Sequence, residues 1–289
     1  MNKTIISKAK KILCLIGVCM LLVQSICAAS ASPKYINCSK TTKLVLRMKA
    51  PANKKCRGQD SYTDKGIFFK FFSDDVVQMY NFKTGRLVRE CAVRGKHCSV
   101  ATCIPKKDGY GRMFIETNTI PSTVYVNEMK GSRPQLSRVL QFPKSKYGHH
   151  MKHVVDSSGR KLYGIAYKTG NRRSPANGNC MIISVWDIRK LKKNSNGTYT
   201  PTLIRTFNIP FIMFSQGMCF FRNKIYILSS DYVSPDTKVY AVDVYGKRIT
   251  EVYQGFPSAI RNRECQGVFV DGGYLYIDAG MTVYRAAKV

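Results

Sequence analysis

The chain has 289 residues, 44% of them hydrophobic, a length that suits one large domain or two small ones with a proper apolar core. Its 47 Lys and Arg residues against 17 acidic residues give a formal net charge of +30, and the basic residues are scattered along the chain. A positive field of this size attracts polyanions, most strongly at low salt. The charge therefore implies either an anionic partner, such as an envelope polymer, an acidic glycan, an anionic lipid or non-specifically bound nucleic acid, or solubility alone.

Residues 1–31 have the pattern of a cleavable secretory signal peptide. Four Lys and no acid accompany an apolar run over residues 12–23, and Ala29-Ser30-Ala31 then offers the small residues that a signal peptidase reads. The apolar run is shorter than the roughly 20 residues of a membrane span, which makes a membrane anchor the weaker alternative, as is a lipoprotein processed at Cys27. We expect cleavage near Ala31, a secreted and monomeric protein without a transmembrane span, and a mature net charge of +26, because the signal peptide carries four Lys and no acid.

The cysteines that remain after the expected cleavage are even in number. The chain after Ala31 contains eight cysteines, namely Cys38, Cys56, Cys91, Cys98, Cys103, Cys180, Cys219 and Cys265. An even number of cysteines in an exported chain permits a set of disulfides, although the sequence cannot assign their pairing. A zinc site is the rival explanation, but no second metal knuckle follows the closely spaced Cys98 and Cys103.

Strand patterns dominate the rest of the chain. β-branched and aromatic runs alternate with turns rich in Gly, Asn and Asp, and no segment keeps a helical period for more than two turns. The clearest predicted strands are Gly66–Phe72, Val76–Phe82, Lys224–Ser229, Lys238–Val244 and Tyr274–Asp278. The sequence therefore predicts an all-β protein.

One sequence unit recurs along the chain. Residues 215–230 and 265–280 each contain Gln-Gly, at Gln216 and Gln266, then a short apolar strand, a turn and a second strand with a central Tyr. The spacing of nine residues from the Gln to the second strand recurs at Gln59, and two looser copies begin at His97 and at the pair His149-His150. The spacing of the five starts resembles the roughly 40–50 residues of a propeller blade, with an insertion at Lys192–Tyr199 in the third gap.

The chain ends suggest how such a fold closes. Only half a blade follows Gln266, and the residues before Gly58 supply about the other half. We therefore predict that residues 32–289 form a single five-bladed β-propeller, closed by the N-terminal strand Lys43–Met48 pairing beside the C-terminal strands, which removes the open sheet edges. The alternative is a β-sandwich of similar strands.

The first strand of each propeller blade lies nearest the axis, so the starts of the repeats are expected to converge at one mouth of the central channel. A ring of side chains with few charges suits hydrogen bonds to a polar ligand, or else it satisfies buried backbone groups around water. The candidate ligand-binding residues are Gln59, His97, His150, Gln216, Glu264 and Gln266.

No catalytic or metal motif supports an enzyme. A calcium-dependent propeller hydrolase needs several oxygen ligands at the axis, where only Glu264 is expected, and His97 and Cys98 are neighbours in a strand, so they point to opposite faces. His149 and His153 share a strand face, which favours a structural role over a metal. We predict no catalytic residue, no metal and no cofactor, with a propeller-type lyase or hydrolase as the alternative.

The His-led unit at His97 and the units SQG…KIYILSS and RECQG…YLYIDAG resemble repeats of secreted propeller-like proteins of Gram-positive bacteria, the helveticin J family of large bacteriocins. Four repeat starts carry the likeness, at His97, His150, Gln216 and Glu264–Gln266. The resemblance implies a propeller and an antagonist of other cells. The chain departs from that pattern in its signal peptide, its cysteines and its basicity. We therefore expect a secreted, non-enzymatic binding protein for a polar ligand or an anionic envelope polymer or glycan, with the bacteriocin-like role as the alternative.

Overall fold

The computed structural model describes residues 32–51, 58–95, 98–106, 109–117, 122–130, 133–142, 152–231 and 236–289. The predicted signal peptide, residues 1–31, lies entirely outside these residues. Within them every regular element but one is a β-strand, the exception being the four-residue helix α3 (Ser258–Arg261). The predicted all-β class is confirmed.

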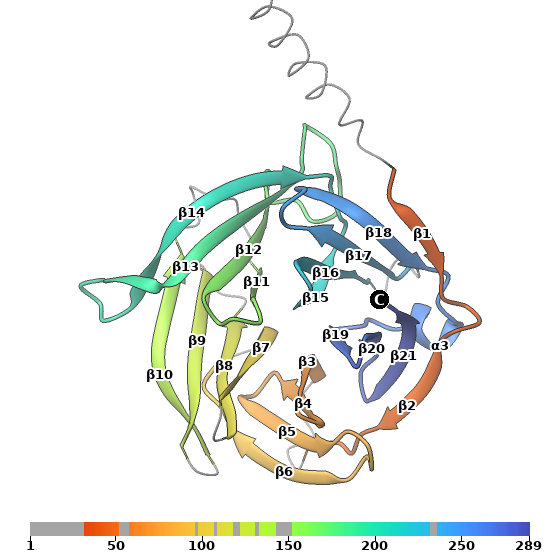
Figure 1. Ribbon diagram of the computed structural model, residues 1–289, viewed down its shortest axis with the longest axis horizontal. Helices are drawn as coiled ribbons and strands as arrows, with labels where there is room; N and C mark the ends of the chain where they lie inside the picture. The colour runs from red at the N-terminus through yellow and green to blue at the C-terminus, as the bar shows by residue number, and fades with distance from the viewer. Residues whose placement is uncertain are drawn as a thin grey trace, which may run out of the picture. The chain divides into compact units, whose positions relative to one another are not determined.

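The strands form four sheets (Figure 1). The first has the order β3 (Gly58–Asp64), β4 (Ile67–Phe72), β5 (Val76–Asn81), β6 (Leu87–Ala92). The second, with eight strands, has the order β11 (Lys152–Val155), β12 (Lys161–Tyr167), β13 (Met181–Lys193), β14 (Tyr199–Ile209), β10 (Arg133–Phe142), β9 (Ser122–Lys130), β8 (Gly109–Thr117), β7 (Cys98–Lys106). The third has the order β1 (Lys34–Asn37), β18 (Arg248–Gln254), β17 (Lys238–Asp243), β16 (Lys224–Ser229), β15 (Ser215–Phe221). The fourth has the order β19 (Gly267–Asp271), β20 (Tyr274–Asp278), β21 (Thr282–Lys288), β2 (Lys43–Arg47).

Five strands lie nearest the centre of the residues 34–289, where they form a closed cycle of contacts. Strand β3 contacts β7, β7 contacts β11, β11 contacts β15, β15 contacts β19, and β19 returns to β3 (Figure 1). The five predicted repeat starts fall within two residues of the first residues of these strands. The repeat pattern in the sequence therefore marks the inner strands.

Strands such as β4 and β16 are buried on both faces, which explains why they read as continuous apolar runs. On β4, Phe68 belongs to one buried cluster while Phe69 and Phe71 belong to another. On β16, Tyr226 and Ile225 divide between two clusters in the same way. Because successive side chains in a strand point to opposite faces, both faces of these strands contribute to apolar layers between neighbouring sheets.

The Gln-Gly pairs of the repeat mark the closest approach between inner strands. A Cβ atom at Gly217 would lie 2.5 Å from the backbone oxygen of Gln266, and one at Gly267 would lie 2.5 Å from Ser61 Oγ. No side chain fits at such distances, so glycine is required for β15 to pack on β19 and for β19 to pack on β3.

The two ends of the chain meet in the fourth sheet. Strand β2 pairs antiparallel with β21, with Lys43 opposite Arg285 and Leu46 opposite Val283, and Met48 N–H donates to Met281 O at 2.9 Å. The predicted pairing of the N-terminal strand with the C-terminal strands is confirmed. The sequence did not predict β1, which adds a parallel fifth strand to β18 in the preceding sheet.

The prediction of a disulfide set fails for the described cysteines. Cys38, Cys91, Cys180, Cys219 and Cys265 are all free thiols. Cys38, Cys219 and Cys265 are buried in one apolar cluster, where cysteine packs as a small hydrophobic residue. Burial raises the pKa of Cys265 to about 12. Cys56 and the side chains of Cys98 and Cys103 lie outside the described residues.

In the part of the chain that the structure describes, no helix has the length and apolarity needed to cross a bilayer.

The closure of the fourth sheet gives the first testable prediction. Leu46 is 4% exposed in the core cluster, whereas Leu44, two residues earlier on the same strand, is 40% exposed. Leu46→Ala should lower the free energy of unfolding by about 2–5 kcal/mol through lost burial and the cavity it leaves, and Leu44→Ala should change it by less than about 0.5 kcal/mol. Denaturant unfolding of both variants measures the difference; equal, small effects would show that β2 is not part of the core.

Candidate functional site at the axis

The predicted ring residues that the structure describes lie at the starts of inner strands. Gln59 is the second residue of β3 and Gln216 the second of β15, and both are buried. Gln266 immediately precedes β19, with Glu264 two residues before it, and both are half-buried. His97 and His150 lie outside the described residues.

The structure brings Gln216 and Glu264 into direct contact. Gln216 Nε2 donates a hydrogen bond of 2.9 Å to Glu264 Oε1, which links β15 to the segment that leads into β19. The half-buried Gln266 is close in sequence to this pair and anchored by its backbone N–H, which donates to Asp278 O at 3.2 Å. This mouth cluster, Gln216, Glu264 and Gln266, presents one carboxylate and two carboxamides, which can both donate and accept hydrogen bonds.

A buried lysine holds the backbone of the mouth cluster. Lys152, the first residue of β11, donates from Nζ to the backbone oxygen of Gln216 at 2.8 Å. Burial lowers the pKa of this ammonium, while the negative charges of Glu116, Asp60 and Glu264 favour its protonated form. The lysine therefore ties β11 to β15 and places a positive centre behind Gln216.

A second group of buried charges connects the first and last sheets. Lys70 Nζ on β4 donates to Gln59 O at 2.8 Å and forms a short ion pair with Asp278 on β20, and both side chains are fully buried. Burial raises the pKa of Asp278, and Lys70 opposes that shift. The pair satisfies a backbone carbonyl at the axis and joins strands that are far apart in the sequence.

Asp60 continues this network toward the next inner strand. Its Oδ1 accepts from Ser61 N–H and its Oδ2 from Ala101 N–H on β7, each at 2.8 Å. Burial raises the pKa of Asp60 well above its usual value, and the two backbone donors act in the opposite direction. Asp60 is therefore a structural acceptor that links β3 to β7.

The expectation of an axis with Glu264 as its only acid is wrong. The structure places Asp60, Asp278, Lys70 and Lys152 in this region as well. A register shift between Gly58 and Ser61 leaves both Gln59 and Asp60 buried, an irregularity that alternation does not anticipate. The available signal was a lysine inside the apolar run Gly66–Phe72, since a lysine in a strand buried on both faces must find a partner.

His153 has a structural place next to the axis. Its ring stacks on Phe142, with centroids 4.2 Å apart, and neither ring nitrogen has a hydrogen-bond partner among the described residues. Burial lowers the pKa of His153 to about 3. The second residue of β11 is thus a neutral aromatic filler; His149 lies outside the described residues.

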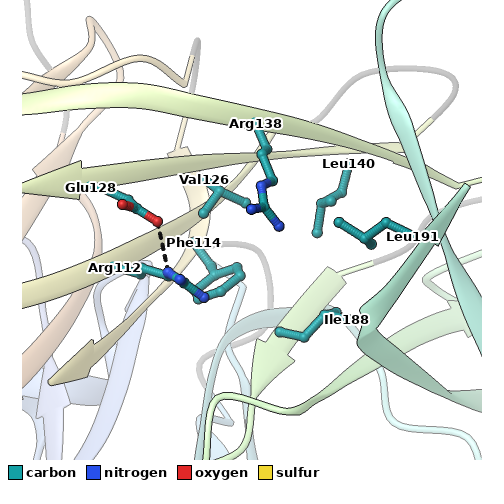
Figure 2. Close-up of a pocket in the computed structure, with 8 residues that line it drawn as sticks. All are labelled: Arg112, Phe114, Val126, Glu128, Arg138, Leu140, Ile188 and Leu191. Carbon is teal, nitrogen blue, oxygen red and sulfur yellow. Dashed lines mark hydrogen bonds and ion pairs between the residues drawn. The ribbon is translucent and has the colours of Figure 1, made fainter. Parts of the chain in front are cut away.

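One small pocket lies away from the axis, between β8–β10 and β13 (Figure 2). Phe114, Val126, Leu140, Ile188 and Leu191 line it together with Arg138 and the ion pair of Arg112 with Glu128, whose Nε–Oε1 distance is 2.7 Å. Its volume of about 20 Å³ is close to that of a single water. The pocket is therefore too small to hold an organic ligand.

Comparisons with known proteins support the fold alone. No protein-family model matches the sequence and no curated protein matches it, so the helveticin J resemblance stays a prediction. The crystal structure of the glutaminyl cyclase of Myxococcus xanthus aligns with a TM-score of 0.57 and 11% identity, covering 89% of this chain and 100% of that one. A luciferin-regenerating enzyme aligns at 0.42 and 12% identity, covering 82% of this chain and 72% of that one. The chain is thus an all-β, β-propeller-like protein.

The state of His153 gives a pH prediction. Its pKa is about 3 in the folded protein against about 6.5 in an unfolded chain, so the unfolded state binds more protons as the pH falls below 6.5. The stability that neutral His153 contributes is present above pH 6.5 and lost toward pH 3, with about 2 kcal/mol lost between pH 7 and pH 5. The variant His153→Phe keeps an aromatic ring on Phe142 but cannot be protonated. Between pH 7 and pH 5 its free energy of unfolding should therefore fall less than that of the unaltered protein. Parallel curves for the two proteins would contradict the assignment.

Proposed function

We propose that the chain is a secreted, five-bladed β-propeller that acts as a non-enzymatic binding protein for an anionic envelope polymer or glycan. The blade count is supported by the eight-stranded sheet, whose two halves are linked, among the described residues, by a strand pairing of the single register position Leu140–Tyr199 between β10 and β14. Divided there, the strands make five groups, each with one of the five inner strands. The mouth cluster, in which Glu264 and Gln266 are half-buried and Gln216 is buried, is the polar contact site that we assign to this ring of blades.

The observation that carries the proposal is that acidic side chains are buried or paired with cations, whereas basic side chains greatly outnumber them. Asp60 and Asp278 are buried at the axis. On the surface, Glu251 is paired with Lys224 at 2.7 Å and Glu128 with Arg112 at 2.7 Å. With 47 basic residues against 17 acids, the chain has too few carboxylates to neutralise most of its cations.

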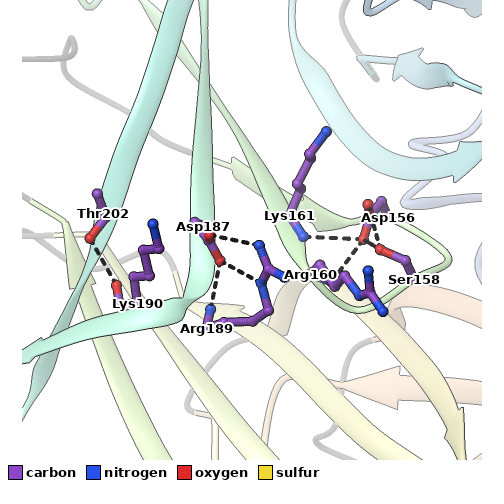
Figure 3. Close-up of polar contacts among 8 residues, drawn as sticks. All are labelled: Asp156, Ser158, Arg160, Lys161, Asp187, Arg189, Lys190 and Thr202. Carbon is purple, nitrogen blue, oxygen red and sulfur yellow. Dashed lines mark hydrogen bonds and ion pairs between the residues drawn. The ribbon is translucent and has the colours of Figure 1, made fainter.

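The edge of β12 and β13 illustrates this imbalance (Figure 3). Both oxygens of Asp187 accept from the guanidinium of Arg189, at 3.0 and 2.9 Å, and this contact holds the pKa of Asp187 at about 2. Asp156 accepts from the backbone N–H groups of Arg160 and Lys161. The Lys161 ammonium points away from Asp156, so these acids leave the local field positive.

The axis supports a binding role over a catalytic one. Lys70, Lys152 and Asp60 already bond to backbone groups of inner strands, so their charges serve the packing of the ring. The mouth cluster is left as the group that can exchange hydrogen bonds with a ligand. Glutaminyl cyclase is an enzyme, but a likeness at 11% identity extends to the fold only.

Salt tests the electrostatic part of the proposal. Binding to immobilised heparin and to lipoteichoic acid should weaken steeply as salt rises, because the Debye length falls from about 10 Å at 0.1 M to about 3 Å at 1 M. Retention on both matrices over a salt gradient measures this effect. Retention that does not change with salt concentration would contradict electrostatic binding. Breakdown of the polymer during incubation would contradict a non-enzymatic role.

Paired substitutions test the mouth cluster. Gln216→Ala with Gln266→Ala removes two carboxamides, and each lost buried hydrogen bond to a ligand costs about 1–3 kcal/mol, so affinity should fall at least tenfold. The probe is the strongest binder from an array of neutral and acidic oligosaccharides, titrated calorimetrically, with thermal unfolding of the same sample as the control. Loss of binding only in step with loss of folding would assign these residues to structure alone.

A further inference from the structure

We infer that the sheet closed by the two chain ends carries a specific binding groove for an acidic polysaccharide, an inference that rests on the proposed function and locates it. The groove has a volume of about 360 Å³, within the range of small-molecule sites. It is separate from the mouth cluster. The side chains that define this closure groove are Lys40, Thr41, Lys43, Tyr274, Arg285 and Lys288.

The groove is lined by four cations and no acid. Lys40 lies in the turn before β2, Lys43 begins β2, and Arg285 and Lys288 belong to β21. None of the four has a carboxylate at ion-pair distance within the described chain. Asp271 lies opposite Tyr274 on β19, which is the side of β20 away from β21.

The register of the sheet places like charges against each other. Lys43 is directly opposite Arg285 across the β2–β21 pair, and like charges in that position destabilise a sheet. An anion bound between them would turn this repulsion into two charge-assisted contacts. The repulsion between Lys43 and Arg285 destabilises the β2–β21 pair, and binding of an anion in the groove would explain why the fold keeps it.

The groove is also ordered before any ligand arrives. The Arg285 guanidinium lies over the Tyr274 ring, 4.8 Å from its centroid, which fixes the direction of its N–H donors. The turn that carries Lys40 is held by Thr42 Oγ1 donating to Cys38 O at 2.6 Å and by Ser39 N–H donating to Asn37 Oδ1 at 2.9 Å. Such order lowers the entropic cost of binding.

The arrangement favours a chain of acidic sugars over a single ion. Cations from two strands and a turn are spread along one groove, as a polymer with repeated carboxylate or sulfate groups requires. Thr41 and the phenol of Tyr274 add groups that can hydrogen-bond to hydroxyls. Predicted export would bring the groove into contact with polysaccharides outside the cell.

Two charge-matched double variants test the groove. Lys43→Gln with Lys288→Gln removes two lining cations, whereas Lys192→Gln with Lys193→Gln removes two exposed cations of β13 that face Thr200 and Tyr199 across the strand pair. Both variants lose the same net charge. Calorimetric titration with a heparin hexasaccharide at low salt should show affinity falling about tenfold or more in the groove variant and less than about threefold in the control, because exposed charges outside the groove act on the ligand only through the screened field of the protein.

Each other outcome overturns the inference in a distinguishable way. Equal losses in the two variants would mean diffuse electrostatic binding, which keeps the proposed function and removes the groove. No binding by the unaltered protein would remove both. Inorganic sulfate that competes fully at equal sulfate concentration would replace the polysaccharide with a single oxyanion, and stronger competition by a single-stranded oligonucleotide of equal charge would assign the groove to nucleic acid.

Discussion

The buried ion pair between Lys70 and Asp278 is the contact on which the arrangement of this protein depends. It joins the second strand of the first sheet to the second strand of the last, and it holds the backbone of Gln59 at the axis. Removing one partner from such a pair leaves a buried charge uncompensated, which typically costs about 3–5 kcal/mol. The same junction brings Gly267 against Ser61 with no room for a Cβ atom. Charge and close packing therefore act together where the first sheet meets the fourth.

The chemistry of the axis follows from this constraint. Inner strands that pack this closely leave backbone groups that water cannot reach, and buried polar groups must be satisfied. Lys70, Lys152 and Asp60 do this at Gln59, Gln216 and Ala101. Because these charges are bonded to the backbone, the proposed binding role falls to the mouth cluster and to the cationic surface. The acids outside the axis are often paired, as Asp187 is with Arg189. Each such pair is neutral, so the excess of basic residues carries the net charge of +30.

Much of the fold could be predicted from the sequence because the repeat has a physical cause. Gly217 and Gly267 are required where inner strands touch, so the Gln-Gly pairs marked those strands to within two residues. The predicted strands Lys224–Ser229 and Tyr274–Asp278 have the bounds of β16 and β20. The buried charges were missed since Lys70 and Asp278 sit in runs that alternation reads as apolar, and their partners come from distant parts of the chain. The disulfide prediction failed at Cys38, Cys219 and Cys265 because spacing cannot distinguish a bridged cysteine from one that fills an apolar core.

The central claim is that residues 34–289 form one closed ring whose last sheet needs strand β2. Hydrogen exchange of a variant lacking residues 32–50 tests it most directly, with the chain that begins at residue 32 as reference. If closure holds the ring together, the amides of β12 and β13, which do not touch the deleted segment in the sheet order, should lose protection together with those of β20 and β21. The deletion also removes β1, so β18 loses its edge neighbour in either case. Protection that is lost only in β18, β20 and β21, with an unchanged melting temperature, would contradict the account.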